Sequence, residues 1–392
     1  MDISLYFDPI HIDNFRYLNR SSRKSFGDVI LKYVPDSYFP DLSDVHMAII
    51  GVGEERGQIG NPGCSQGVDT IRDYFYDLFP GNYQAKVADL GNIKVGHTIQ
   101  DTYFALTAVC AELLSKKIIP VIIGGSQDLT FANYRAYEDL GQIINIVSVD
   151  NQFDLGENDQ ELTSRSYLSK IILHQPNFLF NYTNLGYQTY FVDQDAIRLM
   201  NNLYFDTYRL GNVRANMQEV EPMVRNADMI TIDISAVRQT DAPGNYNATP
   251  NGFYGEEMCQ ITRYAGLSDK LSSIGFYEYN HLLDQNGQTA HLIAQMIWYF
   301  MDGYYNRMQD FPIDKKSMDY KKFMVALSNQ EDELIFFKSK KSDRWWMEVE
   351  CSATVKAKYE RHYLVPCSYD DYEKALSDDV PERWLQAYQK LM

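Results

Sequence analysis

Three acidic residues stand where two apolar segments of the sequence end. In VSVDNQFD, Asp150 and Asp154 are four residues apart with Gln152 between them, and in ITIDIS, Asp233 precedes Ser235 by two residues. Carboxylate oxygens are the ligands that Mg²⁺, Mn²⁺ and Ca²⁺ prefer. Two acidic strand ends in one sheet can therefore converge on a cation. The alternative is that these Asp side chains cap the turns that follow the strands.

A third segment, IIPVIIGGSQDLT, runs from an apolar strand into a Gly-Gly turn and places Gln127 where a metal-binding His would be expected. Imidazole nitrogen is a good ligand for Mn or Zn, whereas an amide offers only a neutral carbonyl oxygen. The segment therefore leaves two hypotheses open. The chain is either a metalloenzyme with an unusual ligand or an enzyme fold that has lost its chemistry.

The elements that must position these residues alternate along the chain from about residue 46. Apolar strands are expected over 46–53, 118–125, 144–150, 189–193, 229–235 and 272–280, and helices over 67–79, 102–117, 217–227 and 288–305. Near-continuous apolar strands separated by helices predict a parallel sheet that is buried on both faces. A site in such a sheet lies beyond the carboxyl ends of the strands, which is where the polar segments of this chain occur.

The two ends of the sequence read differently from this middle part. Residues 1–45 are rich in aromatics without a clear period and predict an N-terminal arm on the α/β domain of residues 46–313. Residues 314–392 predict a small α+β extension, with an antiparallel meander followed by helix. Trp345 and Trp346 lie next to each other in one of its strands. Strand alternation would leave one Trp available to a partner, and the alternative is that both are packed.

Five segments, in order, resemble the arginase–agmatinase–formimidoylglutamase family of ureohydrolases. GNPGCSQGVDTIRDYFYDL is similar to an early glycine-rich helix entry, GGSQD to the GGDHS loop and DNQFD to the DAHxD loop. DISAVRQTDAPG is similar to the DxDxxxxxxAPG segment, and YEYNHLLDQNGQTAHLIAQ to the final helix entry. APGNYNATPNG is closer to the formimidoylglutamase branch. The resemblance spans roughly residues 46–305 and leaves out both terminal extensions.

The resemblance implies a three-layer, arginase-like α/β fold, with a central, mostly parallel sheet and helices on both faces. It also implies a binuclear Mn site that activates water for attack on an amidine or guanidine carbon. Carried over by position, the six ligand places are Gln127, Asp150, Gln152, Asp154, Asp233 and Ser235. The family has His at the first and third places and Asp at the other four, so three ligands have changed.

This exchange predicts a degenerate metal site. Asp150, Asp154 and Asp233 form the best remaining single site, whereas an amide and a hydroxyl at Gln152 and Ser235 are poor ligands for a second ion. Two metals lower the pKa of a bridging water, and one weakly held ion would do so poorly. We therefore expect no cofactor, with one Mn or Mg ion as the alternative.

Three further residues have candidate roles. Glu278 matches the family's acidic residue that faces the substrate's guanidine or amidine group, and the alternative is a charged strand end without a ligand. His174 stands near the place of a family proton-shuttle His, and the alternative is a packed or surface histidine. Converging carboxylates without metal would repel one another. Arg238, or a Lys elsewhere, is the hypothetical replacement for the lost metal charge.

These residues support three functional hypotheses. The first is a ureohydrolase-fold protein that has lost the binuclear centre and its hydrolase activity and acts as a binding or structural component. The second is a hydrolase of a linear amidine, formimidoylglutamase-like, with an atypical single-metal site. The third is a small-molecule sensor without turnover. The ligand exchanges favour the first, so enzymatic activity is not expected.

Composition bounds the partners and the compartment. The 392-residue chain has a formal net charge of −17, which argues against nucleic acid as a partner. The apolar runs are too short to span a bilayer, and the N-terminus has no signal-peptide pattern. Five scattered cysteines are typical of a reduced, cytoplasmic protein. An unknown protein partner and a homo-oligomer both stay open.

Overall fold

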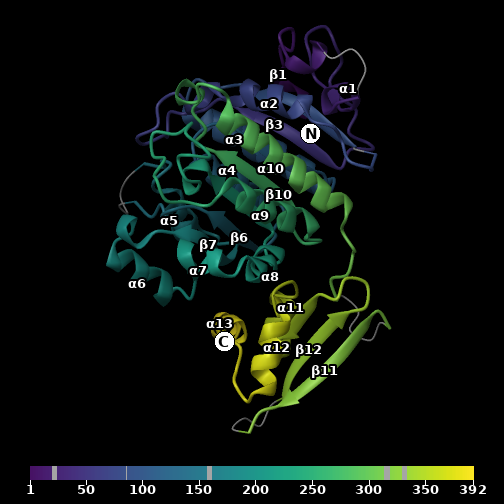
Figure 1. Ribbon diagram of the computed structural model, residues 1–392, viewed down its shortest axis with the longest axis vertical. Coiled ribbons are helices and arrows are strands. Elements are labelled where there is room, and N and C mark those ends of the chain that lie inside the picture. The colour runs from purple at the N-terminus through teal and green to yellow at the C-terminus, as the bar shows by residue number, and fades with distance from the viewer. Residues whose placement is uncertain (20–23, 85, 157–160, 313–317, 329–332) are drawn as a thin grey trace.

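The computed structural model describes residues 1–19, 24–84, 86–156, 161–312, 318–328 and 333–392. Within these ranges, one large sheet has the strand order β1-β4-β3-β5-β10-β9-β6-β7-β8, and β2 also pairs with β4 (Figure 1). The strands are β1 (Phe7–Asp8), β2 (Leu31–Lys32), β3 (Met47–Val52), β4 (Val87–Ile93), β5 (Ile119–Ile123), β6 (Ile144–Val149), β7 (Leu179–Tyr187), β8 (Asp206–Arg209), β9 (Met229–Asp233) and β10 (Ser273–Tyr277). Among these pairings, β1 with β4 is antiparallel and the others are parallel.

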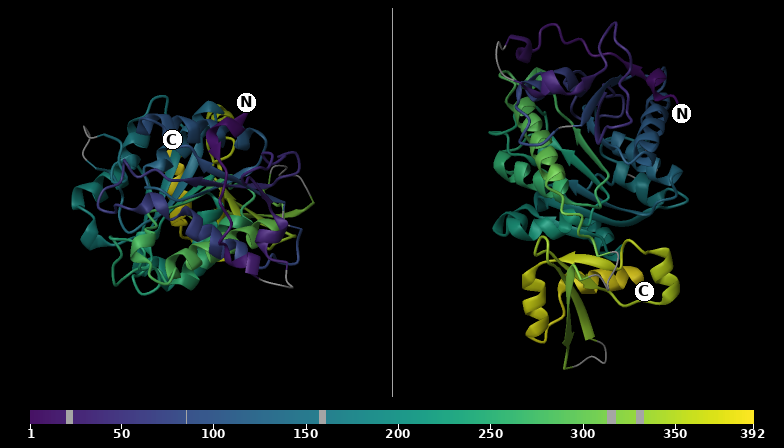
Figure 2. Two further views of the ribbon diagram at one scale, coloured as in Figure 1. Left: turned by 90° about the horizontal axis from the view of Figure 1, so that it is seen from above. Right: turned by 90° about the vertical axis from the view of Figure 1, so that its right-hand side faces the viewer.

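Helices cover both faces of this sheet (Figure 2). One face carries α2 (Val68–Asp77), α8 (Val220–Arg225), α9 (Gly255–Leu267) and α10 (Gln288–Tyr305), and the other carries α3 (Ile99–Ser115), α4 (Leu129–Asp139) and α5 (Tyr167–Leu173). Every residue of β3, β5, β6, β9 and β10 is buried. A strand buried on both faces gains from apolar side chains at every position, which explains the continuous apolar runs. The prediction of an α/β fold with helices on both faces is confirmed.

Some elements differ from the sequence prediction. Residues 189–193 do not form a strand, since Thr189–Phe191 is a 3-10 helix. The strand of this region is β7, which lies just upstream and contains polar residues such as Asn181 and Asn184. The prediction was wrong because polar side chains interrupt the apolar run that signals a buried strand. The first residues are also more than an arm on the surface, since β1 and β2 pair with β4.

The remaining helices of the described residues, outside the C-terminal part of the chain, are short. They are α1 (Phe26–Val29), α6 (Gln194–Asn202) and α7 (Leu210–Ala215), together with the 3-10 helices Ile3–Tyr6, Arg16–Asn19, Cys64–Gln66, Met217–Glu219, Ile234–Ala236 and His281–Leu283. No helix among the described residues is long and apolar enough to cross a membrane.

A second, antiparallel sheet forms the C-terminal part of the chain. Its order is β11 (Tyr320–Ala326), β12 (Glu333–Ser339), β13 (Trp345–Glu348) and β14 (Leu364–Cys367), with α11 (Ala353–Lys358), α12 (Tyr369–Leu376) and α13 (Glu382–Leu391) beside it. The expected boundary at residues 313 and 314 falls outside the described residues. Trp345 and Trp346 are both buried, so neither is left available to a partner.

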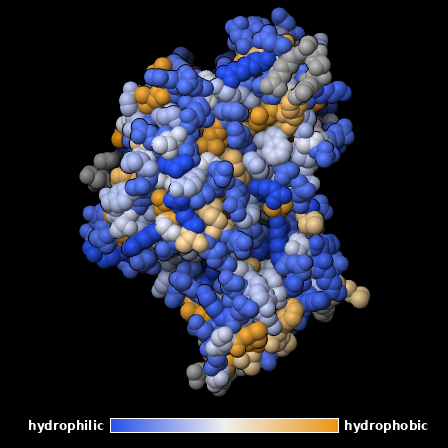
Figure 3. Space-filling model, in the orientation of Figure 1, coloured by the Kyte–Doolittle hydropathy of each residue, from blue (hydrophilic) through white to orange (hydrophobic). Residues whose placement is uncertain are grey.

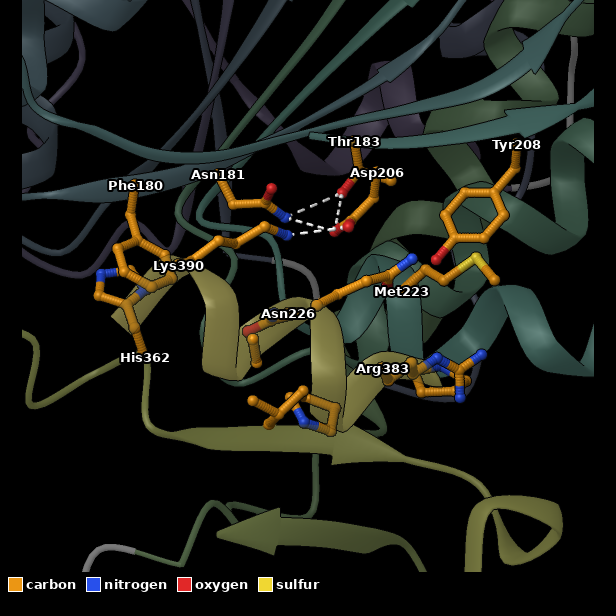
Figure 4. A pocket seen from close by; sticks show the side chains of 15 residues that line it. Phe180, Asn181, Thr183, Asp206, Tyr208, Met223, Asn226, His362, Arg383 and Lys390 are labelled. Carbon is orange, nitrogen blue, oxygen red and sulfur yellow. Dashed lines mark hydrogen bonds and ion pairs between the residues drawn. The ribbon is translucent and has the colours of Figure 1, made fainter. Parts of the chain in front are cut away.

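The C-terminal sheet is joined to the main sheet by aromatic and charged contacts. The guanidinium carbon of Arg225, in α8, lies 4.4 Å from the ring centre of Trp346, and its Nη2 donates to the Trp345 carbonyl. Lys390 of α13 makes an ion pair with Asp206 of β8 at 2.8 Å, beside a cavity of about 40 Å³ (Figure 4). These specific contacts dock the extension on the main domain. The face of the molecule shown in Figure 3 is largely hydrophilic, with scattered hydrophobic residues.

Candidate metal centre

Four neighbouring strands of the main sheet, β5, β10, β9 and β6, end at one place. Register places Tyr277 of β10 beside Asp233 of β9, and Ile232 of β9 beside Val149 of β6. Because these strands are parallel, the residues that follow them emerge at the same edge. Asp150, one residue after Val149, therefore comes next to Asp233.

Asp150, Asp154 and Asp233 form a cluster that we call the carboxylate triad. One oxygen of each carboxylate lies within 4.8 Å of the others, and all three side chains are buried. Buried polar atoms are nearly always hydrogen-bonded, so an open one signals a missing partner. Asp150 Oδ2 and both carboxylate oxygens of Asp154 have no hydrogen-bond partner among the described residues.

Backbone amides hold the other oxygens of the triad. Asp150 Oδ1 accepts a hydrogen bond from the Gln152 N–H at 3.0 Å, and Asp233 Oδ1 accepts one from the Ser235 N–H at 2.7 Å. The turn-capping alternative is thus correct for one oxygen of each of these side chains. The second oxygens stay free to point toward a common centre.

Electrostatics make the triad costly without a cation. Burial, and then the charges of Asp154 and Asp233, raise the pKa of Asp150 well above its usual range. Burial also raises the pKa of Asp154 to about 6 and raises that of Asp233. A divalent cation would reverse these shifts because it favours the ionised carboxylates.

The Gly-Gly turn after β5 brings Gln127 to the same edge. Gly125 has a φ of +73°, and a side chain there would come within 2.7 Å of the Glu54 carbonyl oxygen. Gln127 Nε2 donates to Thr231 Oγ1 at 2.9 Å, while its Oε1 is buried without a hydrogen-bond partner in the described part of the chain. The amide is therefore oriented with its oxygen available as a ligand.

Glu278 lies beside the triad and is held tightly. Its Oε1 accepts from the Gln127 N–H at 2.9 Å and its Oε2 from Asn61 Nδ2 at 2.8 Å. Its φ of +66° is rare for a residue with a side chain, and such strain is common at functional sites. Burial and the charge of Asp233 raise its pKa to about 8, against the hydrogen bonds, which lower it.

Arg165, which no sequence motif marks, is the cation that contacts the triad among the described residues. Its Nη1 lies 3.6 Å from Asp154 Oδ1. Arg238, the hypothetical charge replacement, lies elsewhere: it pairs with Asp241 at 2.9 Å and stacks on the Tyr254 ring at 3.9 Å. That hypothesis is corrected, because the guanidinium of Arg238 is already engaged outside the centre.

Three more of the residues predicted for the site are His174, Ser235 and Gln152. His174 Nε2 contacts Glu138, near the C-terminal end of α4, at 2.9 Å. Since α4 begins at the site edge and runs for 11 residues, His174 is roughly 15 Å away from the triad. This position favours the alternative of a packed or surface histidine. Ser235 Oγ is buried and lacks a hydrogen-bond partner among the described residues, and Gln152 is half-buried.

A family model, the arginase family, matches residues 45–302. The chain belongs to the arginase family. Among curated arginase-family relatives, a formimidoylglutamase of Staphylococcus aureus strain RF122 is 25% identical over 304 residues, which are 76% of this chain and 92% of the relative.

Solved structures of the arginase family have the same fold. Trypanosoma cruzi formiminoglutamase with Mn²⁺ superposes with a TM-score of 0.65 at 16% identity, covering 73% of this chain and all of that one. Bacillus subtilis formimidoylglutamase gives 0.66 at 18% identity, covering 75% of this chain and 97% of that one. The resemblance noted from the motifs is confirmed, and these relatives favour a hydrolase over the expected absence of activity.

The expectation of no cofactor is wrong. The T. cruzi relative was solved with Mn²⁺, and in this chain the three carboxylates at the strand ends do come together. The donors fit one hard divalent cation, because three carboxylates and the open Gln127 Oε1 are all oxygen ligands. Gln152 and Ser235 add only an amide and a hydroxyl for a second ion.

The raised pKa values predict that stability without metal depends on pH. The carboxyl groups of the folded centre keep their protons to a higher pH than those of the unfolded chain. Their contribution to the free energy of unfolding is therefore fully present below about pH 4 and is lost as the pH rises through about 8. In chelator, we expect the thermal midpoint to fall between about pH 5 and pH 8. Glu278→Gln carries no releasable proton and should flatten the curve above about pH 7. If the thermal midpoint of this variant fell with pH as steeply as that of the natural chain, Glu278 would not be the group that titrates there.

Proposed function

We propose that this chain is a divalent-cation-dependent hydrolase of a linear amidine, of the formimidoylglutamase type, with one cation held by Asp150, Asp154 and Asp233. The observation that carries the proposal is the convergence of three buried carboxylates, of which Asp150 and Asp154 have unpartnered oxygens. Gln127 Oε1, which is buried without a hydrogen-bond partner in the described part of the chain, would be the fourth ligand. The relatives named above support the reaction class, and the donor set supports a single ion.

The bound cation would polarise the substrate and acidify a water molecule. The chain's own residues then have separable tasks. Asp150, Asp154 and Asp233 hold the cation, and Glu278 is oriented by Asn61 and by the Gln127 N–H. A carboxylate fixed at this edge is suited to orient a cationic amidinium group by charge and hydrogen bonds. All four of these carboxylate side chains are buried, which limits the access of bulk water to the centre.

The test is Mn²⁺ binding followed by a turnover assay. We expect a stoichiometry near one Mn²⁺ per chain by calorimetry after removal of metals with chelator. Formimidoyl-glutamate should then yield formamide and glutamate, measured by mass spectrometry. A chain that takes up no Mn²⁺ would rule out the proposal, and two ions per chain would show that Gln152 and Ser235 serve as ligands.

A second candidate is a protein that binds an amidine without turnover, as a sensor or a structural component. The observation that favours it is the replacement of three family ligands by Gln127, Gln152 and Ser235. Mn²⁺ binding with a ligand-induced rise in the thermal midpoint, but without formamide release, would select this candidate. Glu278, held by Asn61, would orient the amidinium group in both candidates. Glu278→Gln should therefore abolish the ligand-induced rise in the thermal midpoint.

A further inference from the structure

Arg165 is the charged residue at the centre that neither the motifs nor the proposed reaction uses. It lies between the loop of Asp154 and the first turn of α5. Its Nη1 is 3.6 Å from Asp154 Oδ1, and its side chain is 28% exposed, whereas that of Asp154 is 1% exposed. The charges of Asp154, Asp233, Asp150 and Glu278 all favour its ionised form.

The backbone around Arg165 is fixed, so its position is built into the fold. The Ser164 N–H donates to the Gly57 carbonyl at 2.8 Å, and Ser164 Oγ accepts from the Ile59 N–H at 3.0 Å. Ser166 Oγ accepts from the Thr163 N–H at 3.0 Å. This turn is therefore tied to the loop after β3, and the guanidinium is the part of Arg165 that can move.

The guanidinium of Arg165 is also incompletely satisfied. Its Nη1 is buried and makes no hydrogen bond within the described ranges, although it stands against a carboxylate whose two oxygens are open as well. At 3.6 Å the separation between Nη1 and Asp154 Oδ1 is too long for a hydrogen bond, so this pair is held by charge alone. An ordinary structural ion pair, such as Arg72 with Asp89, is instead closed at 2.8 Å.

We propose that Arg165 is the resident counter-cation of the carboxylate triad and sets how tightly the triad holds a divalent ion. The part of this inference that concerns the affinity for a divalent ion rests on the proposed function, and the counter-cation role does not. A guanidinium offsets one of the three negative charges and repels an arriving cation at short range. Its partial exposure leaves a direction in which the side chain can swing outward when the ion binds. The cation and Arg165 thus compete for the same carboxylates.

Two variants of Arg165 test the proposal. By calorimetry with Mn²⁺ alone, we expect R165Q to bind at least about tenfold more tightly than the natural chain, because the competing charge is gone. R165K keeps the charge and should stay within about threefold. In chelator, R165Q should unfold at a lower temperature, since the triad has lost its counter-ion. Arg198, whose exposed side chain pairs with Asp195, provides the matched control R198Q.

A further variant separates the counter-cation role of Arg165 from its effect on metal affinity. If the triad repels itself in R165Q, adding D154N should restore most of the lost thermal midpoint in chelator. If no variant binds Mn²⁺, the proposed function fails while the chelator midpoints still decide the role of Arg165. An R165Q chain with unchanged Mn²⁺ affinity and an unchanged midpoint would overturn the inference. If R165Q does not fold, rescue by R165K and by R165Q/D154N supports it, and failure of both rescues contradicts it.

Discussion

Asp154→Asn is expected to weaken Mn²⁺ binding by more than about tenfold while raising the thermal midpoint in chelator near pH 8. The amide removes one of three ligand charges from a site in which both Asp154 oxygens are open. It also resembles the protonated carboxyl that the raised pKa of about 6 favours in the metal-free protein. The affinity for Mn²⁺ and the thermal midpoint in chelator should therefore change in opposite directions.

The substitution is suited to this test because Asn tolerates the backbone at this position. Asp154 has a φ of +47°, in the left-handed region that Asn and Asp adopt more readily than other side chains. Asp343, with a φ of +61° and a side chain that is 81% exposed, gives the matched control D343N. Equal loss of Mn²⁺ affinity in both variants, measured by calorimetry, would rule out the triad as the site.

Arg72→Met should lower the free energy of unfolding by about 3–5 kcal/mol, because it leaves a buried carboxylate without its partner. Arg72, in α2, and Asp89, in β4, are both fully buried and share two contacts, at 2.8 and 2.9 Å. Asp89 also accepts from the Tyr76 hydroxyl at 2.9 Å, which does not replace the lost charge. Urea denaturation followed by circular dichroism gives the free energy.

The control for Arg72 is its second carboxylate partner. Asp69 contacts Arg72 Nη1 at 3.0 Å, but its side chain is 48% exposed. Solvent screens such a contact, so Asp69→Asn should cost less than about 1 kcal/mol. If R72M and D69N had similar effects, the pair with Asp89 would not stabilise the contact between α2 and the sheet.

Much of the fold follows from local sequence patterns. The helix predicted over 288–305 is observed as α10 with the same bounds, and the antiparallel meander expected within residues 314–392 is observed as β11 to β14. Apolar periodicity sufficed because these segments are long or alternate clearly. It failed at β7, where the polar side chains of Asn181 and Asn184 are buried through hydrogen bonds that no local pattern reveals.

The candidate site was predictable in its acidic part only. The strand ends identified Asp150, Asp154 and Asp233 because parallel strands share one edge. The need for a balancing charge was also evident, but the sequence pointed to Arg238. Arg165 lies 11 residues after Asp154 in LTSRSYLSK, a stretch without a motif, and reaches the triad through tertiary contacts of its turn. Charge balance alone indicates that a cation is required and not which one.

The strand order has a consequence for how the chain is made. β10, residues Ser273–Tyr277, lies between β5 and β9, although β9 precedes it and β5 is much earlier in the sequence. During synthesis from the N-terminus, the sheet therefore stays divided into two halves, each with an unpaired edge, until β10 has left the ribosome. Asp150, Asp154 and Asp233 follow β6 and β9 on one side of that division, whereas Gln127 follows β5 on the other. A nascent chain that ends before residue 273 therefore lacks the strand that brings Gln127 to the carboxylate triad.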